Sequence, residues 1–409
     1  MSTVRPAALY ATPNALAPFY SRFRVADRLL LTGHSHQAWP DRALAGQLRA
    51  WEDAAAHVDD KWERAFAMAE RVRAGFARLL EEPGNARAYA LAGSTHDLVV
   101  RFLSALPLRE RPRLVTTDGE FHTLRRQLDR LAEEGIEVVK VPAARPDEVA
   151  ERVAAAVDGG TAAALVSSVL FQTGWIVEGL ERVAAACARH GAELLVDAYH
   201  ALNVMPFPLR VLGLDGAYVV GGGYKYCQLG EGNCFLRVPA GCTLRPVVTG
   251  WFAEFEALAE KVGGHVAYGD GGARFAGATY DPTSHYRAAE VFDFFAEQGL
   301  DPALLREVSQ HQVALLAELF DALDLPPAVI DRDRQVPLAK TGGFLALRTP
   351  QAGDLFRALA ARGISTDFRD DRLRLGPAPY LADAQLEAAM AALSEAARTR
   401  DLSAGGNQA

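Results

Sequence analysis

Residues 217–226, Ala217-Tyr218-Val219-Val220-Gly221-Gly222-Gly223-Tyr224-Lys225-Tyr226, join a short apolar run to a lysine through three glycines. The run predicts a buried strand, and the glycines predict a turn at its end. The chain has 409 residues and 43 basic ones, yet only five of these are lysines. A buried lysine can lose its proton and attack a carbonyl, which arginine cannot do. We therefore expect Lys225 to be a reactive amine; the alternative is a strand-end lysine that reaches water.

Strands and helices alternate along the chain on both sides of this stretch. The alternation predicts an α/β fold with a mainly parallel sheet flanked by helices, and such sheets bind ligands at the carboxyl ends of their strands. The apolar runs predict strands at 87–91, 114–116, 137–141, 163–170, 193–196, 217–220 and 234–238. The intervening patterns predict helices from 94 and at 124–134, 146–157 and 179–190.

The pattern divides the chain into four parts. We expect an N-terminal arm (1–45) that contributes to the small domain and the site entrance, a large domain (46–284), a small α+β domain (285–402) and a disordered tail (403–409). Within these parts, 43–80 and 286–323 each read as continuous helical stretches.

Composition narrows the possible partners and location. The formal charge of −8 argues against binding to nucleic acid or to a membrane surface, and no apolar run reaches membrane-spanning length. The four cysteines lack the spacing of metal ligands, so we expect no metal site. Free thiols of this kind predict a cytoplasmic protein.

An acidic residue stands at the end of the strand next to Lys225. Asp197 follows the run 193–196, and His200 lies three residues later. A carboxylate here could pair with the pyridine nitrogen of pyridoxal phosphate, to which Lys225 would be joined as a Schiff base, while His200 supports Asp197 or the ring oxygen. A helix cap or a core histidine would explain the Asp-x-x-His pattern equally well.

Other residues follow strands in the same way. Ser94-Thr95 begin a helix, whose N-terminal N–H groups suit a phosphate, although simple capping is the alternative. Phe121 could stack on a flat ring or lie in the core. Thr173 could touch the edge of the cofactor, or belong to a turn with Gly174. In the small domain, strand alternation puts Arg374 on the same face as Arg372, and one of them could bind a substrate carboxylate.

Together these residues resemble kynureninases and, more broadly, the class V branch of fold-type I pyridoxal-phosphate enzymes. The stretch 197–201 resembles the family's D-x-x-H-A, 223–226 its G-Y-K-Y, and 250–252 its G-W-F. The resemblance extends over roughly residues 25–400. It implies Lys225, Asp197 and His200 as catalytic residues. It also implies a homodimer with shared sites.

The resemblance assigns further roles. Cofactor contacts would come from Ser94, Thr95, Phe121, Thr173, Tyr224 and, across the dimer, Trp251 and Thr279. Substrate contacts would come from Arg374 for the carboxylate, His57 for the aryl part, and His34 and Ser35 of the arm.

The chain departs from the family pattern around the substrate. Gly33-His34-Ser35-His36-Gln37 stands where kynureninases have G-N-S-L-G, and Leu124 replaces an aspartate. Glu254 and Thr279-Tyr280 lie in two further altered segments. The resemblance implies hydrolytic cleavage of kynurenine or a related aryl amino acid to anthranilate and alanine. The alternatives are a class V aminotransferase, a C–S lyase or an epimerase acting on a more polar amino acid, and a non-catalytic binding protein.

Overall fold

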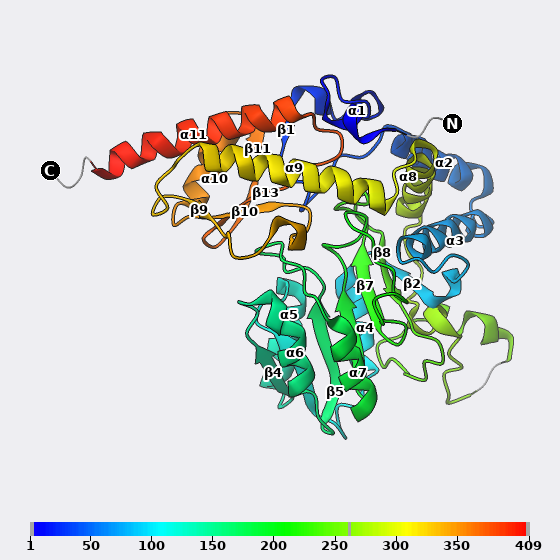
Figure 1. Ribbon diagram of the computed structural model, residues 1–409. Helices are drawn as coiled ribbons and strands as arrows, with labels where there is room; N and C mark the ends of the chain where they lie inside the picture. Colours follow the sequence, from blue (N-terminus) through cyan, green and yellow to red (C-terminus); the bar gives the residue numbers. More distant parts are fainter. Residues whose placement is uncertain (1–3, 261–262, 406–409) are drawn as a thin grey trace.

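A seven-stranded sheet is the largest element of the computed structural model, which describes residues 4–260 and 263–405 (Figure 1). Its strand order is β2-β8-β7-β6-β5-β3-β4, and β8 runs in the direction opposite to the other six strands. The expected mainly parallel sheet is confirmed. Its strands are β2 (Tyr89–Ala92), β3 (Arg113–Thr117), β4 (Glu137–Val141), β5 (Thr161–Ser167), β6 (Glu193–Asp197), β7 (Tyr218–Gly222) and β8 (Cys234–Arg237).

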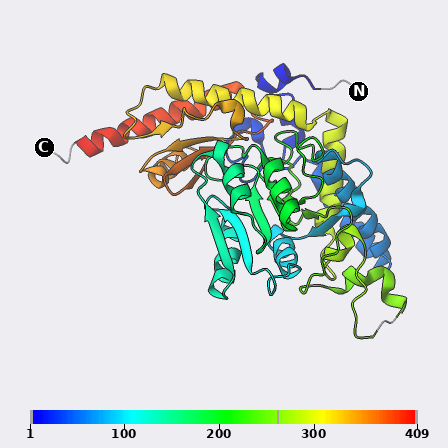
Figure 2. The ribbon, with the colours of Figure 1, turned by 60° about the horizontal axis from the view of Figure 1, so that its bottom comes forward.

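Helices cover both faces of this sheet (Figure 2). Every residue of β5 is buried, as expected for a central parallel strand with helices on each side. Its side chains alternate between two apolar cores, so that Leu165 joins one and Val166 the other. The flanking helices are α4 (Thr95–Ser104), α5 (His122–Glu133), α6 (Pro146–Ala156) and α7 (Leu180–His190).

Two predicted helical stretches are each interrupted. The segment 43–80 forms α2 (Arg42–His57) and α3 (Trp62–Leu79), because Val58 between them has a left-handed φ of 46°. The segment 286–323 forms α8 (Thr283–Gln298) and α9 (Pro302–Ala322). Gly299 ends α8 with a φ of 69°, and the Asp301 side chain caps α9 by accepting the N–H of Leu304 at 2.8 Å.

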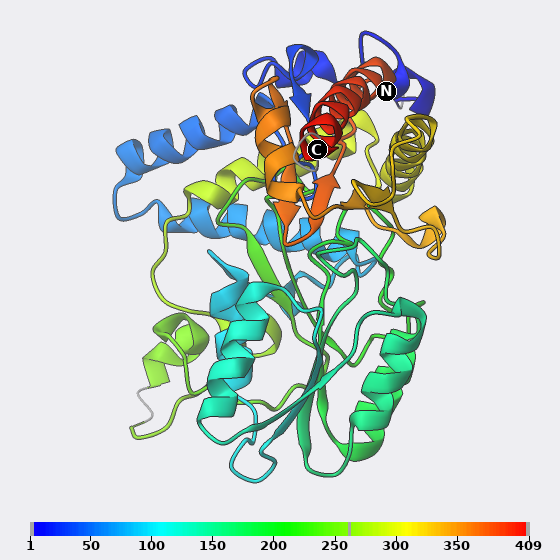
Figure 3. The same ribbon diagram turned by 90° about the vertical axis from the view of Figure 1, so that its left-hand side faces the viewer.

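The small upper part of the molecule contains an antiparallel sheet of order β12-β13-β10-β9, covered by long helices (Figure 3). Its strands are β9 (Asp331–Arg332), β10 (Leu345–Arg348), β12 (Asp367–Arg369) and β13 (Arg372–Leu375). With α9, the helices are α10 (Ala352–Ala360) and α11 (Asp383–Gly405). The expected tail therefore begins inside α11, and its residues 406–409 lie outside the described part. The boundary at residue 284 stays a prediction.

The N-terminal arm joins the two parts. After α1 (Pro6–Tyr10), strand β1 (Leu29–Leu30) pairs in parallel with β11 (Ile364–Ser365) of the small part. Farther along, the N–H of Gln37 donates to the carbonyl of Tyr224 at 3.3 Å, beside Lys225. The arm therefore reaches from the small sheet to the turn that carries the lysine. No described helix is both long and apolar enough to cross a membrane.

Candidate active site

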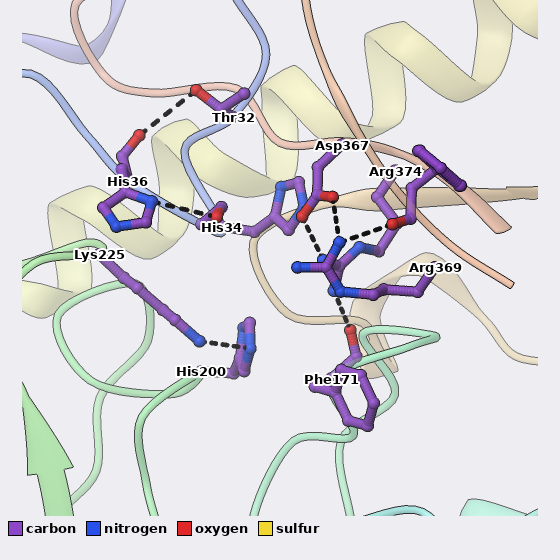
Figure 4. A network of polar contacts seen from close by, with 11 residues as sticks. Thr32, His34, His36, Phe171, His200, Lys225, Asp367, Arg369 and Arg374 are labelled. Atoms are coloured by element: carbon purple, nitrogen blue, oxygen red, sulfur yellow. Dashed lines mark hydrogen bonds and ion pairs between the residues drawn. The ribbon is translucent and has the colours of Figure 1, made fainter. Parts of the chain in front are cut away.

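Lys225 lies in the turn that follows β7, and its side chain is buried with 6% of its surface exposed. The turn is fixed by backbone hydrogen bonds, including one from the N–H of Gly223 to the carbonyl of Asn233 at 2.8 Å. The amine lies 2.7 Å from Nε2 of His200, as Figure 4 shows. The Tyr199 ring centre is 4.7 Å from the amine and that of Phe121 is 5.5 Å away. The lysine thus points into an aromatic cavity rather than out to water.

Burial makes this amine easier to deprotonate. It lowers the pKa of Lys225 from 10.5 to about 7, and the positive charges of Arg374 and Arg369 add to that effect, while Asp197 opposes it. His200 is buried too, and burial together with the Lys225 charge holds the pKa of its imidazole well below the ordinary value. Neutral His200 can therefore accept a hydrogen bond at Nε2 from the lysine, while its Nδ1 has no hydrogen-bond partner in the described chain.

Asp197 ends β6 and lines the same cavity as Lys225. Its Oδ1 accepts a hydrogen bond from the N–H of Tyr199 at 2.8 Å, which fixes the carboxylate at the carboxyl end of β6. Burial raises the pKa of Asp197, whereas the Tyr199 N–H and the Lys225 charge act in the opposite direction. A cationic partner in the cavity would stabilise its ionised form.

The opposite wall of the cavity is aromatic, and one end is the start of a helix. Phe121 and Phe171 meet edge to face with ring centres 5.3 Å apart. Thr95, the first residue of α4, lines the cavity together with Tyr224. The Ser94 hydroxyl accepts the Asp97 N–H at 3.2 Å, so its capping role is confirmed. The N-terminal end of α4 gives this end of the cavity a positive electrostatic character.

A polar network from the small sheet approaches the cavity from the other side (Figure 4). Arg374 is buried and donates to the carbonyl of Phe171 and to the carboxylate of Asp367. Arg369 donates to the other oxygen of Asp367 at 2.6 Å. His34 lies behind Asp367, with Nε2 3.6 Å from Oδ2, a distance too long for a hydrogen bond. Asp367 therefore lies between two arginines and a histidine.

Comparison with known proteins shows that the chain is similar to kynureninases. The family model for the kynureninase C-terminal domain matches residues 305–393. The kynureninase of Pseudomonas fluorescens is 26% identical over 392 residues, which cover 90% of this chain and 88% of that protein. The kynureninase of Burkholderia pseudomallei strain 1106a is 26% identical over 418 residues, with coverages of 93% and 91%. The chain is kynureninase-like over about nine-tenths of its length.

Solved structures agree on the fold of this kynureninase-like chain. The lyase C-DES, in a mutant with glycine covalently linked to its cofactor, superposes with a TM-score of 0.79 at 16% identity, covering 92% of this chain and 98% of that one. The apo cysteine desulfurase of Thermococcus onnurineus NA1 gives a TM-score of 0.78 at 16% identity, with coverages of 98% and 100%. At this identity the likeness establishes the shared fold.

Several residues expected in the site of the kynureninase-like enzyme lie elsewhere. Thr173 lines a separate groove with Trp175 and Arg372, and its hydroxyl accepts the Trp175 N–H at 3.3 Å. The turn alternative suits it, because Gly174 has a φ of 75°. His57 ends α2 and has no contact with the Lys225 cavity in the described chain. Their roles in the site stay predictions.

Trp251 and Thr279 are exposed, on segments away from Lys225. Thr279 lines a different cavity of about 560 Å³. Of the arm residues, His34 is wholly buried behind Asp367, and Ser35 Oγ lies 3.2 Å from Nδ1 of His36. His34 would therefore act on a substrate through Asp367 rather than by direct contact.

Sequence reasoning missed two carboxylates near this site, Asp367, which is partly buried, and Glu120, which is buried. Asp367 could have been found by pairing the strands on either side of the Asp370-Asp371 turn, which sets it opposite Arg374. Glu120 is buried below Asp197 and accepts hydrogen bonds from the hydroxyls of Thr117 and Ser167. Burial raises its pKa to about 7 despite those donors. We found no sequence signal for Glu120.

Proposed function

We propose that this chain binds pyridoxal phosphate covalently through Lys225 and acts on an α-amino acid. The observation that carries the proposal is the buried amine itself, whose pKa of about 7 leaves much of it unprotonated near neutral pH. When bound, pyridoxal phosphate supplies an electron sink for the bonds to the α-carbon. The proposal rests on this amine, on the aromatic wall and carboxylate around it, and on the similarity of the chain to kynureninases.

The residues of the cavity fit the chemical groups of this cofactor. Ionised Asp197 would hold a protonated pyridine nitrogen, because two opposite charges stabilise each other in a buried cavity. Phe121 would stack on the ring, and His200 would use its unpartnered Nδ1 or its Nε2 toward the ring oxygen or the substrate. The first N–H groups of α4, with Thr95 and Tyr224, would hold the phosphate. Thr173 has no part in this assignment.

Lys225 would also move the proton of the substrate. Its Nζ would take the α-proton, because the lowered pKa leaves much of the amine unprotonated and available as a base near neutral pH. His200 at 2.7 Å would hold the amine in one position by a hydrogen bond to its Nε2. Arg374 would bind the substrate carboxylate by charge-assisted hydrogen bonds.

The finer proposal is hydrolytic cleavage of kynurenine or a related aryl amino acid to anthranilate and alanine. It is supported by relatives named kynureninase that cover about nine-tenths of the chain. The polar cluster around Asp367 favours a second candidate, an aminotransferase, C–S lyase or epimerase with a more polar substrate. A desulfurase would need a late cysteine thiol, and no cysteine follows Cys242.

Two experiments test these proposals. Borohydride reduction of the purified protein with pyridoxal phosphate, followed by peptide mass mapping, should label Lys225. The Lys225→Ala variant should lose both the label and the visible absorption band of the bound cofactor. A label on another lysine would refute attachment of the cofactor to Lys225. Anthranilate fluorescence should then appear with kynurenine or 3-hydroxykynurenine. Keto-acid formation from another amino acid, without anthranilate, would favour the second candidate.

We also propose a homodimer that shares its sites. Aromatic rings from α3 and from η4 (Trp251–Glu260) form one contiguous cluster that includes Trp62, Phe66, Trp251 and Phe255. Trp251 and Phe255 are each 46% exposed, and exposed apolar patches of this kind mark interfaces. Light scattering at micromolar concentration should give twice the mass of one chain. Trp251→Glu should yield monomers, whereas Val211→Glu, at an exposed residue outside the cluster, should not.

A further inference from the structure

Asp367 connects two arginines at the edge of the cavity. It lies on β12 directly across from Arg374 on β13. Its Oδ2 accepts from Arg374 Nη2, and its Oδ1 accepts from Arg369 Nη1 at 2.6 Å. Two guanidinium groups side by side repel each other, one buried on Arg374 and one partly exposed on Arg369, and after burial the Arg369 charge contributes to the lowered pKa of Arg374. The shared carboxylate is what allows both arginines to point to one place.

The pair keeps donor capacity for a further acceptor. Arg374 is only 3% exposed, and its two terminal nitrogens are taken by Phe171 and Asp367. Its Nε is buried and has no partner within residues 4–260 and 263–405. An unpaired buried donor destabilises the folded protein. A carboxylate oxygen from a ligand would remove that destabilisation.

The charges of the cluster also leave room for one anion. Two guanidinium groups and one carboxylate give a net charge of +1. His34 adds none near neutral pH, because burial lowers its pKa to about 4. The His34 ring is held between Phe344, with ring centres 4.7 Å apart, and the backbone of Gly376. One ligand carboxylate would therefore balance the cluster, and a neutral amide in its place would not.

The cluster faces the reactive amine. Phe171, whose carbonyl accepts from Arg374, lines the Lys225 cavity. Arg374, Arg369 and Asp367 all influence the charge on Lys225. A carboxylate bound at the arginines would thus belong to the molecule whose α-carbon lies at the lysine.

We propose that Asp367 is a positioning residue that joins Arg374 and Arg369 into one clamp for a single substrate carboxylate. This inference rests on the proposed function and deepens it. It predicts that the enzyme selects amino acids over their amides and that the Asp367 carboxylate, which does not touch the substrate, makes this selection possible.

The Asp367→Asn variant distinguishes two roles of Asp367: its positioning of the arginines and the effect of its negative charge on a bound anion. Removing the negative charge alone would strengthen the attraction for an anion. Loss of positioning has the opposite sign, because the side chain of Arg369 is 37% exposed and, without its counter-ion, is expected to turn toward water. The variant therefore distinguishes the two effects by the direction of the change.

The experiment compares the binding of L-alanine and L-alaninamide to the holoenzyme through the change in cofactor absorbance. The wild type should prefer L-alanine by roughly 30-fold or more, as expected for a buried charged hydrogen-bond pair. In Asp367→Asn that preference should fall at least tenfold while cofactor content is unchanged. Asp371→Asn, which removes a carboxylate paired with Arg372 at 3.1 Å on the same hairpin, should keep it.

An unchanged or increased preference in Asp367→Asn would overturn the clamp. If borohydride labels Lys225 normally, that result leaves the proposed function intact. If the wild type takes up no cofactor, the proposed function fails, and the clamp fails with it.

Discussion

Replacing Lys225 by methionine should stabilise the protein freed of cofactor, and more so at lower pH. The pKa of the buried amine is about 7 against 10.5 for a free lysine. The folded protein therefore gives up this proton more readily than the unfolded chain, so protonation destabilises the fold as the pH drops. The linkage relation gives a penalty of about 4 kcal/mol at pH 7 and about 2 kcal/mol at pH 9, and almost none above pH 10.5.

Methionine fills a similar volume without a charge. It also leaves Nε2 of His200 without its partner at 2.7 Å, a cost of about 1 kcal/mol that does not vary between pH 7 and 9. The informative quantity is thus the stabilisation at pH 7 minus that at pH 9, expected near 2 kcal/mol. Urea unfolding of both proteins at one fixed protein concentration measures it.

The control is Lys61→Met, at the start of α3 and outside the cavity. It should give the same effect at both pH values. A Lys225→Met stabilisation that is equal at pH 7 and pH 9 would refute the reasoning, because it would mean that the amine is hydrated in the folded protein. The lysine would then be an ordinary strand-end residue without a reactive amine.

Three further substitutions test the site and its support. Asp197→Asn keeps an acceptor for the Tyr199 N–H but removes the charge, so kcat should fall by about 10²-fold or more while the cofactor is retained. Steady-state kinetics with the substrate identified above measures this, and an unchanged kcat would contradict the role of Asp197. Arg374→Ala should raise KM by an amount equivalent to roughly 2–4 kcal/mol, and unchanged kinetics would transfer the carboxylate role to Arg369. Gly376→Ala should lower the free energy of unfolding, measured in urea, by about 1–3 kcal/mol, because the new Cβ would lie 2.2 Å from Nδ1 of His34. The control is Gly216→Ala, whose Cβ meets no atom within 4 Å, and equal effects of the two substitutions would contradict this packing.

The part of the site built on the parallel sheet could be predicted from sequence. Lys225 and Asp197 each follow an apolar run, and the carboxyl ends of neighbouring parallel strands meet at one edge. Their approach therefore follows from the strand order alone. The same reasoning predicted that Phe121 and Thr95 line the site, because they follow β3 and β2 by a few residues along the chain.

The rest depends on contacts that periodicity does not encode. The pairing of Asp367 with Arg374 needs the register of a hairpin, and a shift of one residue would turn both side chains to the other face. The break between α2 and α3 depends on one left-handed residue, Val58, a residue type that rarely adopts that conformation. Glu120 could not be predicted, because a buried carboxylate is tolerated only where donors such as Ser167 surround it.

The pairing of β1 with β11 sets an order of events during synthesis. The ribosome releases residues 29–32 early, but their partner backbone at 364–376 is made only near the end. Until then Leu30 and Leu31, both buried in the finished protein, have nothing to pack against in the small sheet. Pairing of β1 with β11 is therefore a late event in folding. A chain that ends before residue 364 would leave β1 without its partner strand.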